Sequence, residues 1–592
     1  MAQDELHKQD SVGKVRRALS LYRGGDAAGA AALCEATLAL DDGQADAWHL
    51  LGLTHLDGGR LQQAVGAFTE AIRLAPEVAG FHVNLAAALH RLGEISAAAG
   101  SSQTALRLDA RLPDAHYNYG NVLLDLDRPD DAETHFAEAA ALNPRHAQAL
   151  NNLGHLLRRR GDLDEAIGRF RAAVSVAPGY AAAWSNLCGS LSEAGRRADA
   201  IEAGRRAVQL DPQGADGFYN LGNAYAALPR PDQAIDCYRQ SLQCDPTHLD
   251  CLVNLGAALQ SMGHCEMAVD VLDRALRLSP SLPAATWNKA LALLLSGRFQ
   301  EGWACYEARW DAVPWMRPSV SDKPMWDGAP LQGRTILVTA EQGFGDAIQF
   351  VRYASMVRAR GGSVVLEAPH ALSALFRRLP DKPPVVAMGE ARPPFDVWAP
   401  VMSLPRLFET ELETIPNHCP YFDVGAAAAP LSGGEGRPRV GLVWRGSLTN
   451  DRGAFRSCRL VDLEPLLEFA RVTFVSLQTE LSDDDRALLD AREIEDLGSS
   501  FGSFLDTAEA IQGLDLVITV DTATAHLAGA LARPVWTLLS AMPDWRWLLD
   551  RRDSPWYPTM RLFRQPALGD WAGVVADVVC ALKADLEKGQ LG

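Results

Sequence analysis

The chain has 592 residues, of which 48% are hydrophobic and 22% are charged, and its formal net charge is -18. This length is too great for a single hydrophobic core and predicts several domains. The acidic balance argues against a nucleic-acid partner and against a broadly basic membrane-binding surface.

Two further features bear on the cellular compartment. The first five residues, MAQDE, carry acid and lack the apolar core of a secretory signal, and no run of about twenty apolar residues could span a membrane. The 10 cysteines form no Cys-x-x-Cys pair and no Cys/His set with zinc spacing. We therefore expect a reduced, cytoplasmic protein without a metal site or membrane insertion.

The first half of the chain repeats itself every 34 residues, which is the period of the tetratricopeptide repeat. Each unit of this kind is a helix-turn-helix that buries its apolar face only against its neighbours. Residues 10–43 fit a degenerate first unit, so we predict an all-α tetratricopeptide superhelix of about eight to nine units over residues 1–310. The unit that starts at Ala45 has the signature residues Trp48, Leu51, Gly52, Ala64, Phe68, Ala71 and Pro76.

An asparagine occupies the same place in the first helix of successive units. Asparagine disfavours helix interiors because its amide competes for backbone hydrogen bonds, so this regularity suggests a role other than folding. An amide carries a donor and an acceptor and can pair with one peptide group of an extended chain. The array resembles that of O-GlcNAc transferase, which implies a groove that holds an acceptor polypeptide. The alternative is a solvated residue or a link between neighbouring repeats. The asparagines are Asn84, Asn118, Asn152, Asn186, Asn220, Asn254 and Asn288.

The end of the array departs from the pattern. Lys289 and Ala290 replace the usual Leu and Gly, and Trp303 and Trp310 follow in a stretch that is richer in aromatic residues than earlier units. We interpret this stretch as the seam with the next domain. Residues 311–333 contain several prolines, which break helices and stiffen the chain, and we predict a linker there.

Beyond the linker, short apolar runs alternate with amphipathic stretches, which is typical of α/β domains with a parallel sheet. We predict one Rossmann-like domain over residues 334–424 and a second, donor-binding one over residues 425–592. Facing each other across a cleft, they would form a GT-B module, and ligands would bind beyond the carboxyl ends of the strands. The predicted strands are Thr335–Ala340, Ser363–Glu367, Phe395–Val401, Val440–Trp444, Val472–Leu477, Leu516–Val520 and Val535–Leu539.

The segment from 520 to 528, VDTATAHLA, follows one of these strands. Thr522 opens a helix whose free N–H groups favour a phosphate, and His526 lies one turn later on the same face. Asp521 would repel an anion and is assigned to the turn. A capped helix with a packed histidine is the alternative. The segment resembles the Asp-Thr-Gly-x-x-His-x-Ala-Ala motif of lipopolysaccharide heptosyltransferases, which implies binding of the donor nucleotide, with Ala523 in place of the usual Gly.

The loop from Arg445 to Arg459 follows another strand and carries several arginines in an acidic chain. Such a loop can neutralise charge on a leaving nucleotide without a metal. An ordinary solvated loop is the alternative. Arg456 and Ser457 are the leading candidates in this loop for binding the donor.

Two more strand ends carry candidate residues. Gly343 and Gly345 allow a close approach to a ligand, and Asp346, at the head of a helix, can accept the proton of an attacking hydroxyl. Asp346 matches the position of the proposed base in heptosyltransferases, and a plain helix cap is the alternative. Gln478 could touch the base or ribose of the donor. The segment SPWYP, residues 554–558, is expected to close the cleft.

Over its length the chain resembles bacterial tetratricopeptide glycosyltransferases that modify flagellin in the cytoplasm before export. The similarity includes residues 341–346, EQGFGD, and residues 554–558. It implies O-glycosylation of Ser or Thr by an inverting, metal-independent enzyme. The acceptor is expected to be flagellin held by the array, and the co-substrate a nucleotide sugar, with a CMP-linked nonulosonic acid as one candidate and no other cofactor.

Two other functions fit the same residues. The chain could be an adaptor whose glycosyltransferase-like domain is inactive, so that replacing Asp346 would leave modification of the partner unchanged. It could also elongate a lipopolysaccharide or other glycan, with the array as a tether.

Overall fold

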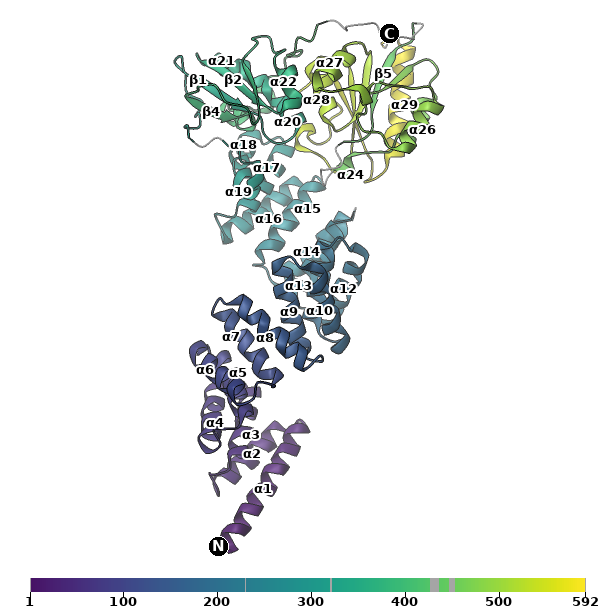
Figure 1. The fold of residues 1–592 in the computed structure, drawn as a ribbon. Helices are drawn as coiled ribbons and strands as arrows, with labels where there is room; N and C mark the ends of the chain where they lie inside the picture. The colour runs from purple at the N-terminus through teal and green to yellow at the C-terminus, as the bar shows by residue number, and fades with distance from the viewer. Residues whose placement is uncertain (1, 229, 320–321, 426–435, 447–452, 591–592) are drawn as a thin grey trace. The chain divides into compact units, whose positions relative to one another are not determined.

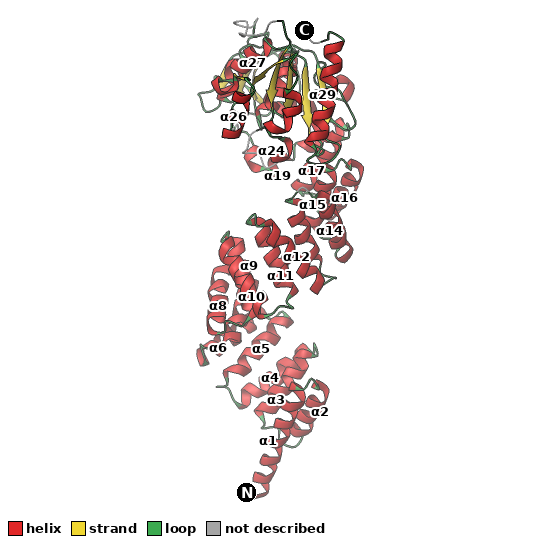
Figure 2. Cartoon of the chain, turned by 90° about the vertical axis from the view of Figure 1, so that its right-hand side faces the viewer, coloured by secondary structure: helices red, strands yellow, loops and turns green. Residues whose placement is uncertain are grey.

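The computed structural model describes residues 2–228, 230–319, 322–425, 436–446 and 453–590. The chain divides into two compact units, residues 1–228 and 229–592. Within the described residues, strands occur only between Thr335 and Arg564, as Figure 2 shows. The predicted order of an all-helical part followed by an α/β part is therefore confirmed at this level.

The first unit consists of helix pairs joined by short turns (Figure 1). From α3 on, the first helix of each pair begins 34 residues after that of the preceding pair, and α1 and α2 lie where the degenerate unit is predicted. The helices are α1 (Ala2–Arg23), α2 (Ala27–Leu38), α3 (Ala45–Asp57), α4 (Leu61–Leu74), α5 (Ala79–Leu92), α6 (Ile95–Leu108), α7 (Pro113–Asp125), α8 (Pro129–Leu142), α9 (Ala147–Arg160), α10 (Leu163–Val176), α11 (Ala181–Glu193), α12 (Arg197–Leu210) and α13 (Ala215–Ala226).

The repeat glycine lets the two helices of a pair approach each other. A Cβ atom on Gly120 would lie 2.6 Å from the Phe136 ring, and one on Gly154 would lie 2.8 Å from the Phe170 ring. Real Cβ contacts are longer than this, so any larger residue would push the ring and its helix away. The signature residues of the sequence therefore form the contact inside each pair.

The second unit begins with further helices of the same kind and then adds two short ones. Figure 1 shows α17, α18 and α19 directly beside the first sheet. These elements are α14 (Pro231–Cys244), α15 (Leu249–Ser261), α16 (Cys265–Leu278), α17 (Pro283–Leu295), α18 (Phe299–Tyr306), α19 (Arg309–Ala312) and the 3₁₀ turn η1 (Pro314–Met316).

The last repeat shares a hydrophobic core with the α/β region. The Trp303 ring meets Phe350 and Trp545 edge to face, at centroid distances of 6.2 and 5.4 Å. Its Nε1 donates to the carbonyl oxygen of Thr410 at 3.1 Å. Aromatic pairs of this kind add stability beyond the area they bury. The aromatic stretch at the end of the array is thus a packed seam, as the sequence suggests.

A buried ion pair reinforces this seam. The Arg309 side chain is fully buried, and its Nη2 atom lies 2.7 Å from Oε1 of Glu341, at the end of the first strand. Arg309 also donates to Ser403 Oγ at 2.8 Å, and Trp310 Nε1 donates to Glu341 at 3.1 Å. These bonds satisfy the buried charges, which would otherwise be costly to remove from water.

The end of the predicted linker is attached to the first sheet. Trp326 is buried, and its backbone N–H donates to the carbonyl oxygen of Trp398 at 2.7 Å, while Trp398 N donates to Pro324 O at 3.2 Å. This stretch pairs with an edge strand because its own backbone groups need partners once they are buried.

The first sheet has four parallel strands in the order β3-β2-β1-β4. Its strands are β1 (Thr335–Thr339), β2 (Ser363–Ala368), β3 (Val385–Ala387) and β4 (Val397–Pro400). Its helical elements are α20 (Phe344–Phe350), η2 (Val351–Tyr353), α21 (Ala354–Arg358), α22 (His370–Phe376), η3 (Val401–Ser403), α23 (Leu404–Leu407) and η4 (Leu412–Thr414).

The second sheet has six parallel strands in the order β10-β9-β8-β5-β6-β7, so that chain direction across the sheet reverses between β5 and β8. This is the strand order of a doubly wound sheet. Its strands are β5 (Arg439–Val443), β6 (Thr473–Ser476), β7 (Glu495–Asp496), β8 (Leu516–Val520), β9 (Val535–Leu539) and β10 (Met560–Arg564). Its helical elements are α24 (Gly453–Arg456), η5 (Leu460–Leu463), α25 (Glu464–Leu467), α26 (Asp483–Ala491), η6 (Gly498–Ser500), α27 (Phe504–Gln512), α28 (Ala523–Ala530), η7 (Trp545–Trp547) and α29 (Trp571–Glu587).

All seven predicted strands are present within one or two residues of their expected ends. The sequence analysis missed β3, β7 and β10. The first two have only three and two residues, and β10 carries an arginine at its second position, so neither length nor apolar alternation marks them.

The 554–558 segment, which is expected to close the cleft, is part of the protein interior. Trp556 and Tyr557 are fully buried, and both pack against the guanidinium of the buried Arg352. Arg352 donates to the carbonyl oxygen of Trp556 at 2.8 Å and to Tyr421 Oη at 3.1 Å. Large aromatic side chains next to a buried cation stabilise this packing, and closure of the cleft by the segment stays a prediction.

Candidate functional site

One cavity of about 910 Å³ lies at the carboxyl ends of several strands of both sheets. The turns after β1, β5, β6 and β8 all contribute to its lining, as do α15, α17 and the segment before η7. The β5 and β8 turns flank the point where the second sheet reverses direction. Ligands of open α/β sheets bind at such a point.

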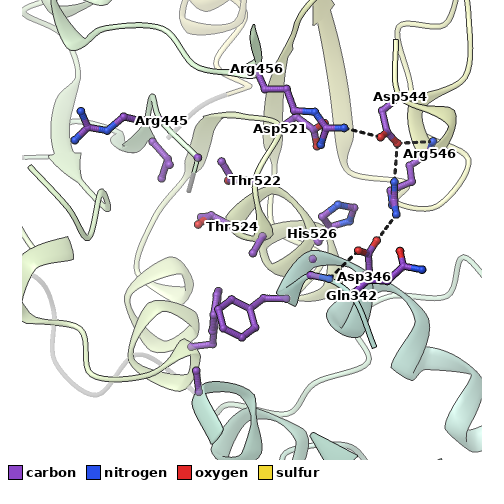
Figure 3. Close-up of a pocket in the computed structure, with 18 of the residues that line it drawn as sticks. Gln342, Asp346, Arg445, Arg456, Asp521, Thr522, Thr524, His526, Asp544 and Arg546 are labelled. Carbon is purple, nitrogen blue, oxygen red and sulfur yellow. Dashed lines mark hydrogen bonds and ion pairs between the residues drawn. The ribbon is translucent and has the colours of Figure 1, made fainter. Parts of the chain in front are cut away.

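An alternating chain of charged side chains crosses this cavity (Figure 3). Arg456 lies 3.1 Å from Asp521 and 2.8 Å from Asp544, and Arg546 lies 2.9 Å from Asp544. Arg546 also pairs with Asp346. The chain thus joins the turns after β1, β8 and β9 through the loop after β5.

Burial and neighbouring charge shift the pKa values of these groups in different directions. Asp521 raises the pKa of Arg456, so this guanidinium stays charged. Burial raises the pKa of Asp521 itself. Burial also opposes ionisation of Asp544, but Arg546 and Arg456 outweigh it and lower the pKa of that carboxyl. Asp544 is therefore the anion that holds the two arginines together.

Both oxygens of the Asp346 carboxylate have partners. Oδ2 accepts a hydrogen bond from the backbone N–H of Gly343 at 3.1 Å, and Oδ1 is held by Arg546. Asp346 is the third residue of α20, and Gly343 is the N-cap. The residue therefore caps the helix, as the alternative from the sequence states, and it also lines the cavity; its catalytic role stays a prediction.

The two glycines of this turn line the cavity with Asp346. A Cβ atom on Gly345 would lie 2.7 Å from Cδ2 of His526. The missing side chain of Gly345 therefore makes room for α28, which lies beside α20 in Figure 1. We expected this glycine to make room for a ligand.

The β8–α28 turn supplies the predicted phosphate site. Thr522 is the N-cap of α28, and its hydroxyl lies 3.0 Å from that of Thr519. Thr522, Ala523 and Thr524 line the cavity, so the first N–H groups of the helix are at its wall.

His526 is held firmly in place. Its Nδ1 lies 3.0 Å from Tyr557 Oη, and its ring stacks on Trp547 at a centroid distance of 5.0 Å. Burial, with a smaller effect of Arg546, lowers the pKa of His526 to about 3. The imidazole is therefore neutral at physiological pH and can donate or accept a hydrogen bond without carrying charge.

The remaining predicted donor residues divide between two cavities. Gln478 lines the main cavity, and its Oε1 accepts a hydrogen bond from the backbone N–H of Arg445 at 3.1 Å. Arg445 lies apart from the charged chain in Figure 3. Ser457 lines a separate cavity of about 810 Å³, and its hydroxyl accepts from Gly446 N at 3.1 Å. Arg452, within the predicted arginine loop, lies outside the described residues.

The asparagine series of the first unit connects neighbouring repeats. Each amide nitrogen is bonded to the repeat before it, and the structure thus shows the inter-repeat link that the sequence allowed as the alternative. A primary amide retains further hydrogen-bonding capacity, so binding of a polypeptide stays a prediction. The contacts run from Asn84 to His49 (2.7 Å), Asn118 to the Val83 carbonyl (3.3 Å), Asn152 to Asn121 (3.0 Å), Asn186 to Asn151 (3.0 Å) and Asn220 to Ser185 Oγ (2.9 Å). Asn254 and Asn288 belong to α15 and α17 of the second unit.

Asp544 and Arg546, the centre of the charged chain, are not among the residues predicted from the sequence. Both follow β9, and the rule that active residues come just after strands points to them as well. The four residues between β9 and Asp544, SAMP from 540 to 543, form no recognisable motif.

In the part of the chain that the structure describes, no three His, Cys, Asp or Glu side chains come together as a metal ion would require. No helix in that part is both long and apolar enough to cross a membrane.

Comparison with known proteins identifies the repeats. Tetratricopeptide-repeat family profiles match residues 15–79, 49–116, 117–186, 215–248 and 253–308. Protein FlbA from Caulobacter vibrioides is 30% identical over 331 residues, which cover 50% of this chain and 54% of FlbA. The chain thus spans about half the length of this curated relative.

Solved structures similar to this chain match parts of it. YrrB, described as a TPR protein with an unusual peptide-binding site, has 26% identity and a TM-score of 0.29, covering 32% of this chain and 97% of YrrB. The APC/C hetero-tetramer Cut9-Hcn1 has 18% identity and a TM-score of 0.39, covering 47% of this chain and 55% of the matched one. The family profiles, and not these partial structural matches, identify the helical part of this protein as a tetratricopeptide-repeat array.

Proposed function

We propose that this protein is a glycosyltransferase that moves a sugar from a nucleotide-sugar donor to a Ser or Thr hydroxyl of a protein. In this proposal the two parallel sheets are the Rossmann-like domains of a GT-B module. The proposal includes cytoplasmic action and an acceptor that the repeat array recruits. Flagellin is the acceptor to test first, and a CMP-linked nonulosonic acid is the first donor.

One observation carries the proposal. Asp346, Thr522 and Gln478 are candidates from three different strand ends, and all of them line the same cavity, together with Arg456. A volume of about 910 Å³ is within the range of small-molecule and cofactor sites. A site that binds a nucleotide sugar needs these elements together: a base, a helix end for phosphate and a cation.

The roles follow from the geometry. The N-terminus of α28 and the Thr522 hydroxyl would bind the donor phosphate. Arg456 has two of its five N–H donors directed at carboxylates and can share another with a phosphate oxygen. Asp346 would accept the proton of the acceptor hydroxyl once that hydroxyl displaces Arg546 from Oδ1.

The reaction is a single displacement. The acceptor oxygen forms a bond to the anomeric carbon, and the bond from that carbon to the phosphate oxygen breaks. The hydroxyl proton passes to Asp346, and the electron pair leaves with the nucleotide phosphate, where α28 and Arg456 stabilise the charge. Attack opposite to the leaving group inverts the anomeric centre.

The test is intact-mass analysis of flagellin co-expressed with this protein and a sugar-nucleotide pathway. We expect a mass increase with the natural chain and a rate lower by about 10²- to 10⁴-fold with Asp346→Asn. Asp553→Asn, a change of an exposed carboxylate outside the cavity, should have no effect. Unmodified flagellin in the presence of the demonstrated donor would count against the proposal.

An adaptor without catalysis is the second candidate, and the pairing of Asp346 with Arg546 and Gly343 favours it. An adaptor would bind its partner equally well with Asp346→Asn, and no variant would change the partner's mass.

A third candidate is transfer of the sugar to a saccharide. It is favoured because the asparagines of the first unit form hydrogen bonds to the preceding repeat. In that case Asn152→Ala with Asn186→Ala would leave turnover of a soluble acceptor unchanged.

A further inference from the structure

We propose that an acceptor wall in the cavity selects polypeptide segments with a bulky apolar side chain close to the hydroxyl that receives the sugar. The acceptor wall consists of Trp287 and Leu291 on α17 and of Trp315 and Met316 in η1, all of which line the cavity. The inference rests on the proposed function, because it assigns the acceptor side of the same cavity.

A series of direct contacts links the acceptor wall to the carboxylate that is proposed as the base. The Trp287 ring lies 4.8 Å from the Tyr306 ring, and Tyr306 lies 6.0 Å from Trp545. The Arg546 guanidinium stands 4.2 Å from the Trp545 ring and pairs with Asp346. The acceptor wall is therefore connected to Asp346 through three side chains, Tyr306, Trp545 and Arg546, which line the same cavity.

The rim of the cavity exposes aromatic surface that the fold leaves uncovered. Trp315 is 75% exposed and Phe344 is 43% exposed. Among the described residues these are the two exposed tryptophan or phenylalanine side chains, and both line this cavity. Exposed aromatic side chains of this kind mark contact surfaces, since tryptophan is among the residues that contribute most to binding.

A polypeptide is the occupant that the surrounding residues favour. The repeats supply part of the cavity lining: Gln260 on α15 and Trp287 and Leu291 on α17 line it, and the same two helices carry Asn254 and Asn288. Leu291 follows Asn288 by three residues and therefore shares its side of α17. A polypeptide that binds along α15 and α17 would thus reach the wall.

The chemistry of the wall sets the sequence preference. An apolar side chain within two residues of the acceptor hydroxyl would bury its surface against the tryptophans, which is favourable. A carboxylate or ammonium group there would lose water and gain no charged partner from the four wall residues. We therefore expect Leu or Phe next to the modified Ser or Thr, and Asp or Lys to be excluded.

Two short fluorescent peptides test this preference with the full-length protein. Both contain a single Ser, flanked at two positions on each side by Leu in one peptide and by Asn in the other. Anisotropy should show that the Leu peptide binds at least about tenfold more tightly. Trp315→Ala should bring the ratio of affinities close to one. Met267→Ala, which truncates an exposed side chain on α16 outside the cavity, should preserve the ratio.

A second readout separates the two proposals. When both peptides compete for sugar transfer from the donor that modifies flagellin, the Leu peptide should be modified preferentially, and Trp287→Ala should abolish this preference. Equal affinity for both peptides, or a Trp315→Ala variant that loses only affinity for the nucleotide sugar, would overturn the acceptor wall. Discrimination between peptides without any sugar transfer would support the wall and contradict the proposed function.

Discussion

The repeats of the first unit and the α/β region use polar side chains in different ways. In the repeats, an asparagine bonds to a residue 35 positions earlier, as Asn118 and Asn220 do, so each contact joins one repeat to the next. In the α/β region, Asp346 and Arg546 are 200 positions apart. Local contacts of the first kind repeat with the sequence and stabilise an array. Contacts of the second kind depend on the complete topology and create a single site.

The largest expected effect comes from the seam between the last repeat and the first sheet. Arg309→Met leaves Glu341 buried without its cation and should lower the free energy of unfolding of the second unit by about 3–5 kcal/mol. Chemical denaturation followed by tryptophan fluorescence measures this. Arg298→Met removes a partly exposed pair with Glu301 and should cost less than about 1 kcal/mol.

A double variant sharpens this result. Arg309→Met with Glu341→Leu removes both charges and should recover a large part of the loss, because no charge is left buried alone. If the double variant is as unstable as the sum of both single variants, the ion pair is not what holds the seam.

The second effect is a pH dependence in the α/β region. The pKa of His526 is about 3 in the folded protein against an ordinary 6.5, so the unfolded state binds more protons between these values. Stability should therefore fall as the pH decreases from 6.5 towards 3, by up to about 1.4 kcal/mol per pH unit from this residue. His526→Gln should flatten the plot of melting temperature against pH. An unchanged slope would mean that the imidazole is solvated.

A smaller effect is expected inside the repeats. Gly154→Ala places a Cβ atom 2.8 Å from the Phe170 ring and should destabilise the array by about 1–3 kcal/mol, reduced by the better helix propensity of alanine. Gly168→Ala, in the other helix of the same pair, meets nothing within 4 Å and should stabilise the array by about 0.5–1 kcal/mol. Amide hydrogen exchange of α8 to α11 would show whether the loss of stability is confined to the helices that adjoin Gly154.

The smallest effect decides between two roles of the asparagines. Asn220→Ala removes a buried link to Ser185 and should cost about 0.5–1.5 kcal/mol of array stability. Measured affinity for an extended polypeptide then discriminates between the roles. A loss of affinity larger than the loss of stability explains would support a groove, and unchanged affinity would leave the asparagines as links alone.

The same contrast explains how much could be predicted. The repeat array was predictable because Gly154 and Phe170 recur at fixed spacing and touch within one unit. The strands at 516–520 and 535–539 were predictable because continuous apolar runs mark buried parallel strands. Contacts between residues that are far apart in the sequence could not be predicted in this way. Trp556 and Tyr557 pack against Arg352, which lies about 200 positions earlier in the sequence, and no spacing reveals such a contact.

Within the site, sequence-based prediction picked out residues that stand in a recognisable turn, such as Asp346 and Thr522; both line the cavity, and their roles stay predictions. It failed to single out Arg546, whose role depends on Asp544 beside it and on Asp346 across the cavity. It also did not distinguish the orientations of adjacent residues: Arg456 lines the main cavity, whereas Ser457 lines a different one. Spacing alone does not tell which way a loop residue faces.

The contact of Gly345 with His526 has a consequence for ligand association. Together with the pair between Arg546 and Asp346, it fastens the turns after β1 and β8 to each other before anything is bound. A ligand therefore binds to two turns that are already held in a fixed orientation, so little of the binding free energy is spent on ordering the protein. Gly345→Ala would push these two turns apart. We expect this variant to bind the ligand more weakly although every residue that contacts the ligand is still present.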